Sequence, residues 1–196
     1  AAPVLFCANH LSAHDAYAVA VLDEVLGGGG RVLMDEAQLE RLPFFRSLGA
    51  LPLSLTSPRR ALSQLADAAT WLSSPRRSLW IFPQGRHVPS WRRPLGFRRG
   101  FVRVLRQAPT AVVVPVSWLL VFRDALQPLF VVRFGRPLPG DVDADVVEAA
   151  VADGLDAIDA RVAAGALPAP LISGQGGAPG RGPASRWLAR LVRSLP

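Results

Sequence analysis

The sequence contains no lysine, only one cysteine, and no apolar run long enough to cross a membrane. Because Cys7 has no second cysteine, an internal disulfide framework and a cysteine-rich zinc site are both excluded. A membrane-spanning helix needs about 20 consecutive apolar residues. The best candidate, 108–122, is shorter and is interrupted by Pro115 and Ser117, so it is interpreted as a buried strand. We therefore expect a protein of the reducing cytoplasm.

Acidic residues are missing from one long part of the chain. None occurs between Asp67 and Asp124, where arginines are frequent, whereas the stretch from Asp141 to Asp159 is acidic and contains no arginine. With 22 basic against 15 acidic residues, the net charge is +7. This uneven distribution predicts one face that attracts anions. A nucleic-acid partner is not expected, because no recognised binding motif accompanies the charge.

Short apolar runs alternate with longer amphipathic stretches along the chain. The alternation predicts an α/β layered domain with a largely parallel sheet flanked by helices. In such sheets, functional sites lie beyond the carboxyl ends of the strands. The expected strands are 4–8, 31–34, 50–53, 78–82, 111–120 and 130–134, and the expected helices are 13–26, 58–72, 98–106 and 143–164, the last with its acids facing outward.

The composition changes towards the C-terminus. We expect a catalytic domain over residues 1–167, a flexible Gly/Pro-rich linker over 168–183, and an amphipathic basic helix over 184–196. Trp187 and three leucines share one face of that helix, with arginines on the other. This pattern fits an interfacial helix on a lipid surface, and equally a terminal helix docked on its own domain.

His10 and Asp15 stand five residues apart, directly after the first expected strand. On a continuous helix this spacing separates two side chains by about 140°. They meet only if His10 precedes the helix and folds back onto its first turn. A carboxylate that holds one imidazole nitrogen fixes the tautomer and leaves the other nitrogen as a general base for an alcohol.

Other interpretations of this segment remain. A metal pair of His10 and His14 lacks a third ligand, and Leu11 occupies the place where a metalloprotease needs Glu, so no metal is expected. Cys7 as a nucleophile would lie inside the expected strand, where packing in the core is the commoner role. A structural histidine that caps a helix also fits the pair taken alone.

A second polar segment follows the expected strand at 78–82. It reads Phe82-Pro83-Gln84-Gly85-Arg86-His87, and Phe97-Arg98-Arg99-Gly100 comes shortly after it. Together with Asn9, His10 and Asp15 in an N-H-x4-D pattern, and with a V-P-V run at 114–116, these motifs resemble those of the PlsC-type glycerolipid acyltransferases, the 1-acylglycerol-3-phosphate acyltransferase family. The order and spacing of the motifs agree over residues 4–120.

The resemblance implies a glycerolipid acyltransferase-like fold and an O-acyl transfer reaction. His10, oriented by Asp15, would deprotonate an acceptor hydroxyl that attacks an acyl thioester of coenzyme A or acyl carrier protein. The acceptor would be 1-acylglycerol-3-phosphate or a related lipid alcohol, and the enzyme would lie on the inner face of the cell membrane without a cofactor. The implied substrate-binding residues are Asn9, Phe82, Pro83, Gln84, Gly85, Arg86, His87, Arg98 and Arg99.

Four residues depart from the family pattern. Gln84 replaces a glutamate, Arg86-His87 replaces Thr-Arg, and Leu55 stands where an arginine that holds the acceptor phosphate is expected. Two alternatives follow. The acceptor is a lipid without phosphate, such as a glycosylated terpenoid, or the domain is a catalytically weak or inactive module that binds membrane lipid.

Overall fold

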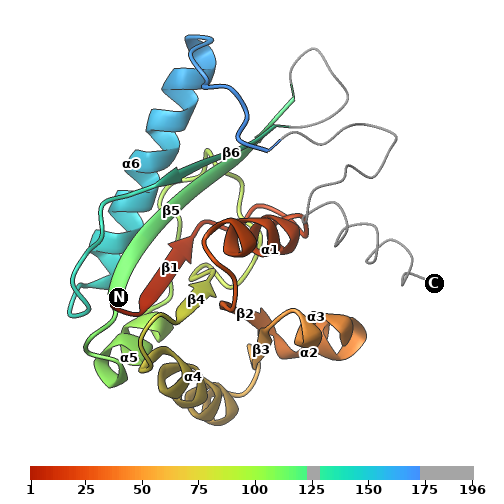
Figure 1. The fold of residues 1–196 in the computed structure, drawn as a ribbon, viewed down its shortest axis with the longest axis vertical. Coiled ribbons are helices and arrows are strands. Elements are labelled where there is room, and N and C mark those ends of the chain that lie inside the picture. Colours follow the sequence, from red (N-terminus) through yellow and green to blue (C-terminus); the bar gives the residue numbers. More distant parts are fainter. Residues whose placement is uncertain (123–128, 173–196) are drawn as a thin grey trace.

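The computed structural model describes residues 1–122 and 129–172, which form a six-stranded sheet with helices on both faces (Figure 1). The strands are β1 (Val4–Ala8), β2 (Arg31–Asp35), β3 (Ala50–Leu53), β4 (Ser78–Ile81), β5 (Val112–Val121) and β6 (Leu129–Phe134). Their order in the sheet is β3-β2-β4-β1-β5-β6. All neighbouring strands are parallel except β6, which is antiparallel to β5. The predicted fold class is confirmed.

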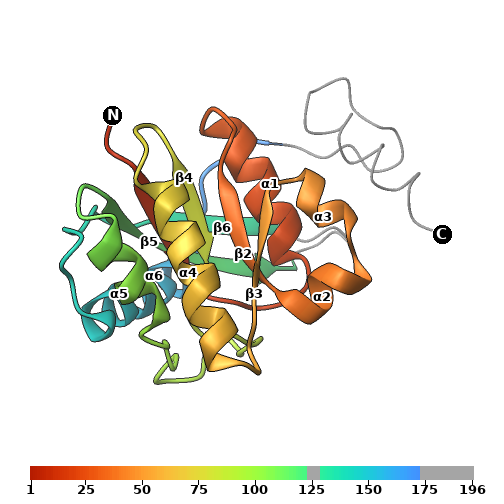
Figure 2. The ribbon, with the colours of Figure 1, turned by 90° about the horizontal axis from the view of Figure 1, so that it is seen from below.

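The helices divide between the two faces of the sheet. Figure 2 shows α1 (Asp15–Val25) on one side and α4 (Pro58–Leu72), α5 (Gly100–Gln107) and α6 (Ala144–Ala163) on the other. Successive side chains of a strand point to opposite faces. Leu5 and Cys7 of β1 accordingly pack with α4 and α5, whereas Phe6 and Ala8 pack with α1 and with Trp80 and Trp118.

The helix α4 begins where the sequence predicts it. The Ser57 side chain accepts a hydrogen bond from the backbone N–H of Arg60, and Pro58 occupies the first turn, where its missing N–H costs nothing. β3 contains Pro52 and lies at the edge of the sheet, which is where a strand tolerates proline.

Two short helices were not predicted. α2 (Glu36–Arg41) and α3 (Phe44–Ser47) follow β2 and cover the end of the sheet near β3. The predicted start of the first helix also shifts, from residue 13 to Asp15. This shift leaves residues 9–14 as a turn between β1 and α1.

No helix in the described ranges is long and apolar enough to span a bilayer. The predicted helix 184–196 and most of the predicted linker, from residue 173 onward, lie outside the described residues.

Candidate active site

Three parallel strands bring the two polar motifs together. β4 and β5 flank β1, with Cys7 paired in register with Ile81 and Ala8 paired with Val116. The loops that leave β1 and β4 therefore emerge side by side at the carboxyl edge of the sheet, as the rule for parallel sheets predicts.

Asn9 closes the ladder between β1 and β5 after β1 ends. Its side-chain Oδ1 accepts from the backbone N–H of Trp118 at 2.9 Å, and its Nδ2 donates to the Trp118 carbonyl at 3.1 Å. The amide thus takes the place of one peptide group in the sheet. Asn9 is 1% exposed, so its side chain fixes the departure of the chain towards His10. The role in substrate binding that the resemblance implies for Asn9 stays a prediction.

His10 and Asp15 are in contact. His10 Nδ1 lies 2.7 Å from Asp15 Oδ2, and the same oxygen accepts the backbone N–H groups of Leu11 at 2.6 Å and Ser12 at 3.2 Å. Asp15 starts α1, where the helix N-terminus favours a negative charge. Because this oxygen acts as an acceptor, we assign the ring proton to Nδ1, which leaves Nε2 of His10 as the basic nitrogen.

The two side chains differ in exposure. The Asp15 carboxylate is fully buried, whereas 23% of the His10 side chain is exposed. Among the described residues, Nε2 of His10 has no hydrogen-bond partner. The pair therefore presents the basic nitrogen Nε2 on a partly exposed imidazole. The buried Asp15 carboxylate fixes the orientation of this ring through Nδ1.

Two aromatic rings hold the His10 imidazole. Phe82 stacks on it with ring centroids 4.4 Å apart, and His87 meets it edge-on at 4.3 Å. Partial burial, followed by repulsion from His10, lowers the pKa of His87 below its ordinary value of 6.5, with a smaller opposite effect from Asp15. His87 is therefore neutral at neutral pH.

Gln84 connects the second motif to the first. Its Oε1 accepts the backbone N–H of His10 at 2.6 Å, and its Nε2 donates to the Leu95 carbonyl at 3.1 Å. The backbone N–H of Val88 also donates to the His10 carbonyl at 2.8 Å. Gln84 is 2% exposed and Pro83 is also buried. Both residues thus support the site, and the substrate contact that the resemblance implies for them stays a prediction.

The predicted arginines do not form one cluster. Gly85 has a positive φ of 64°, and a Cβ built there would lie 3.3 Å from the Arg98 guanidinium, so Arg98 lies against the glycine turn. Arg86, on the same turn, is exposed. Arg99 instead binds Asp145 on α6 at 3.2 Å, and both side chains are 78% exposed.

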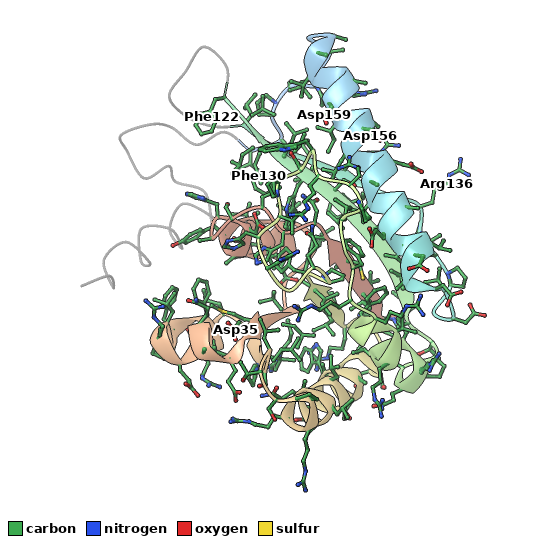
Figure 3. The ribbon with its side chains drawn as sticks, turned by 180° about the vertical axis from the view of Figure 1, so that it is seen from behind. Asp35, Phe122, Phe130, Arg136, Asp156 and Asp159 are labelled. Atoms are coloured by element: carbon green, nitrogen blue, oxygen red, sulfur yellow. The ribbon has the colours of Figure 1, made fainter. Side chains whose placement is uncertain are left out.

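The helix α6 holds the loop between β4 and α5 through acidic side chains. Glu148 accepts the backbone N–H groups of Gly96 at 3.0 Å and Phe97 at 2.7 Å. Asp156, which lies farther along α6 (Figure 3), binds Arg93 at 2.6 Å. The expectation that the acids of this helix all face outward into solvent is therefore wrong for Glu148. The sequence contained no local signal for this role of Glu148, because the backbone groups that it binds lie about fifty residues away in the chain.

The geometry does not support Cys7 as a nucleophile or a metal pair of His10 and His14. Cys7 is fully buried, and burial raises the pKa of its thiol far above the ordinary value, so no reactive thiolate is available. His14 is exposed and lies 3.3 Å from the Ser12 hydroxyl. In the part of the chain that the structure describes, no three His, Cys, Asp or Glu side chains gather as a metal site.

A comparison with models of protein families gives a match. The model of the Acyltransferase family matches residues 1–118, which include the strands β1 to β4, most of β5 and both motifs. The chain therefore belongs to the acyltransferase family, which includes the PlsC-type glycerolipid acyltransferases. A search of curated proteins found no match to the chain.

Proposed function

We propose that the protein transfers a fatty acyl group from a coenzyme A or acyl carrier protein thioester to a hydroxyl group of a lipid acceptor. The observation that carries the proposal is the contact of 2.7 Å between Nδ1 of the partly exposed His10 and the buried Asp15 carboxylate. Membership of the acyltransferase family supports acyl transfer in general. The proposed place of reaction is the inner face of the cell membrane.

The chemistry follows from the free nitrogen of His10. Nε2 takes the proton of the acceptor hydroxyl while its oxygen attacks the thioester carbonyl. The C–O bond of the new ester forms, the C–S bond breaks, and the departing thiolate takes the proton back from His10. Asp15 stabilises the imidazolium that exists between these two transfers. A base of this kind contributes roughly 10²- to 10⁴-fold in rate.

The surroundings of the glycine turn support a lysophospholipid-like acceptor. The Arg98 guanidinium lies against Gly85, and the exposed Arg86 follows Gly85 in the chain; the paired N–H donors of arginine suit phosphate oxygens. Leu55, in the place where the family has an arginine, is 41% exposed and supplies no charge. Arg60, a nearby cation, is bound to Glu36. Because neither Leu55 nor Arg60 supplies a free positive charge for a phosphate, the proposed acceptors also include lipid alcohols without a phosphate.

The proposal is tested by incubating the full chain with an acyl-coenzyme A and a mixed lipid extract. Released thiol is followed with a thiol reagent, and the lipids are analysed by mass spectrometry. We expect one class of lipid to gain the mass of one acyl group as an equal amount of thiol appears. Thiol release at the background rate with unchanged lipids contradicts the proposal and favours a module that only binds lipid.

A further inference from the structure

We propose that the loop formed by residues 86–95, the Trp91 loop, docks the protein on an anionic lipid bilayer by inserting Trp91 into the interface. This inference rests on the proposed function, because it assumes that the acceptor is a membrane lipid. It goes further by naming the surface that meets the membrane.

Trp91 is unusually exposed for its size. It is 81% exposed, whereas Trp80 and Trp118 are fully buried. Within the described ranges it has neither an aromatic neighbour nor a guanidinium over its ring, in contrast to Trp71, whose ring is contacted by the guanidinium groups of Arg31 and Arg77. The side chain thus projects from the molecule without a partner.

The loop that presents Trp91 is held at both ends. At its start, the buried Val88 donates its backbone N–H to the His10 carbonyl. At its end, the buried Leu95 accepts from Gln84, and Arg93 binds Asp156 on α6 at 2.6 Å. An anchored loop keeps its large apolar tip in one position, so little ordering is required when the tip inserts.

The charges around the tip favour an anionic surface. Arg86 and Arg92 are exposed, and among the described residues neither has an acidic partner. Of the acids of α6, Asp156 is already bound to Arg93 of the loop, and Glu148 is bound to the backbone N–H groups of Gly96 and Phe97, directly after the loop. The loop therefore carries an exposed indole and two exposed arginines without acidic partners, the combination that lipid headgroup regions accommodate.

An isolated exposed apolar side chain is common on protein surfaces and needs no explanation by itself. The position of this one relative to the site is what indicates a lipid surface. The loop is hydrogen-bonded to His10, so insertion of Trp91 holds the catalytic ring beside the layer that contains acceptor hydroxyl groups. A membrane-bound lipid then reaches Nε2 of His10 without leaving the interface.

Sedimentation with vesicles of equal parts phosphatidylglycerol and phosphatidylcholine tests the inference on the full chain, without acyl donor. We expect Trp91→Ala to weaken partitioning about tenfold or more, and Arg92→Ala to weaken it about fivefold. The matched controls, Leu62→Ala on α4 and Arg106→Ala on α5, also remove exposed side chains and are expected to bind as wild type.

A second readout reports on the indole itself. In a Trp187→Phe background, fluorescence should shift to the blue on vesicle addition, because Trp91 leaves water. Trp80 and Trp118 stay buried, Trp71 stays packed against Arg31 and Arg77, and the shift should be absent in a Trp91→Phe, Trp187→Phe double variant. Wild-type partitioning of Trp91→Ala, or an unshifted spectrum, overturns the inference. If the loop binds a protein instead, the chain stays in solution when the vesicles sediment, and this result also overturns the inference.

Failure of this inference is distinguishable from failure of the proposed function. Trp91→Ala should acylate a dispersed, short-chain acceptor at the wild-type rate, whereas His10→Ala should bind vesicles as wild type and transfer nothing. Loss of transfer to the dispersed acceptor by Trp91→Ala would show that the loop serves the chemistry and overturn its assignment to docking.

Discussion

At the scale of single residues, Asp15 is the most constrained group of the site, because one of its oxygens accepts three hydrogen bonds. An asparagine can present its carbonyl oxygen to the same donors but lacks the charge that stabilises the imidazolium. We expect Asp15→Asn to lower kcat on the order of 10²- to 10⁴-fold with little change in acceptor KM. Steady-state acyl transfer measures this, with Asp67→Asn on the surface of α4 as the control. A kcat close to that of the control would show that Asp15 only shapes the turn.

The two hydrogen bonds of Gln84 require an amide at the position where the resemblance implies a glutamate. Both of its polar atoms are used, one as acceptor from His10 and one as donor to Leu95. We expect Gln84→Glu to lower the free energy of unfolding by about 1–3 kcal/mol, because a buried oxygen would face the Leu95 carbonyl without a hydrogen between them. Chemical denaturation should show this loss, while the exposed Gln38→Glu should stay within about 0.5 kcal/mol of wild type. Equal stabilities of the two variants would contradict the bridging role.

The position of His87 predicts that the stability of the fold depends on pH. Burial and the neighbouring His10 lower its pKa in the folded protein, whereas the unfolded chain has the ordinary value of 6.5. The unfolded state therefore binds more protons as the pH falls below 6.5, and the folded state loses stability in that range. We expect the free energy of unfolding to decrease more steeply in wild type than in His87→Gln between neutral pH and the folded pKa. Parallel pH profiles for the two proteins would disprove this linkage.

The sequence predicted the contact between His10 and Asp15 better than the residues that support it. The spacing of His10 and Asp15, after a strand and before a helix, required the folded-back geometry that is observed. The burial of Asn9 and Gln84 was not predictable, because each bonds to backbone groups of another chain segment. Sequence spacing carries no information on such long-range backbone partners.

At the scale of elements, α6 acts as a clamp on the loop between β4 and α5. Glu148 holds two backbone amides of that loop, and hydrogen bonds to a charged group contribute about 1.5–3 kcal/mol each. We expect Glu148→Ala to speed amide exchange at Gly96 and Phe97 by about tenfold or more and to raise the acceptor KM. Hydrogen exchange by NMR measures the first effect, and Asp153→Ala, an exposed change on the same helix, is the control. Unchanged protection of both amides would show that α6 does not hold the loop.

Long elements were predictable and short ones were not. The long buried strand β5 and the capped helix α4 have strong patterns, and both begin within one residue of the predicted positions. α2 and α3 have six and four residues, too few for a helical period to be recognised, and they form because Leu39 and Phe45 pack together beside Ala50.

At the scale of the whole molecule, basic and acidic segments that are separate in the sequence lie together in the fold and partly neutralise each other. The arginine-rich segment before β5 and the acidic helix α6 are brought together, with Arg93 bound to Asp156 and Arg99 bound to Asp145. The predicted anion-binding face is therefore smaller than the sequence implied. Two exposed arginines remain at the glycine turn, because Arg86 follows Gly85 in the chain and the Arg98 guanidinium lies against Gly85.

The rate of acyl transfer by His10→Ala, compared with His14→Ala, tests the central claim most directly. Both variants remove an imidazole from the same turn, but only His10 is held by Asp15, and His14 is exposed. The account predicts a loss of roughly 10²- to 10⁴-fold for His10→Ala, with its circular dichroism spectrum unchanged, and a wild-type rate for His14→Ala. A wild-type rate in a folded His10→Ala protein would contradict it.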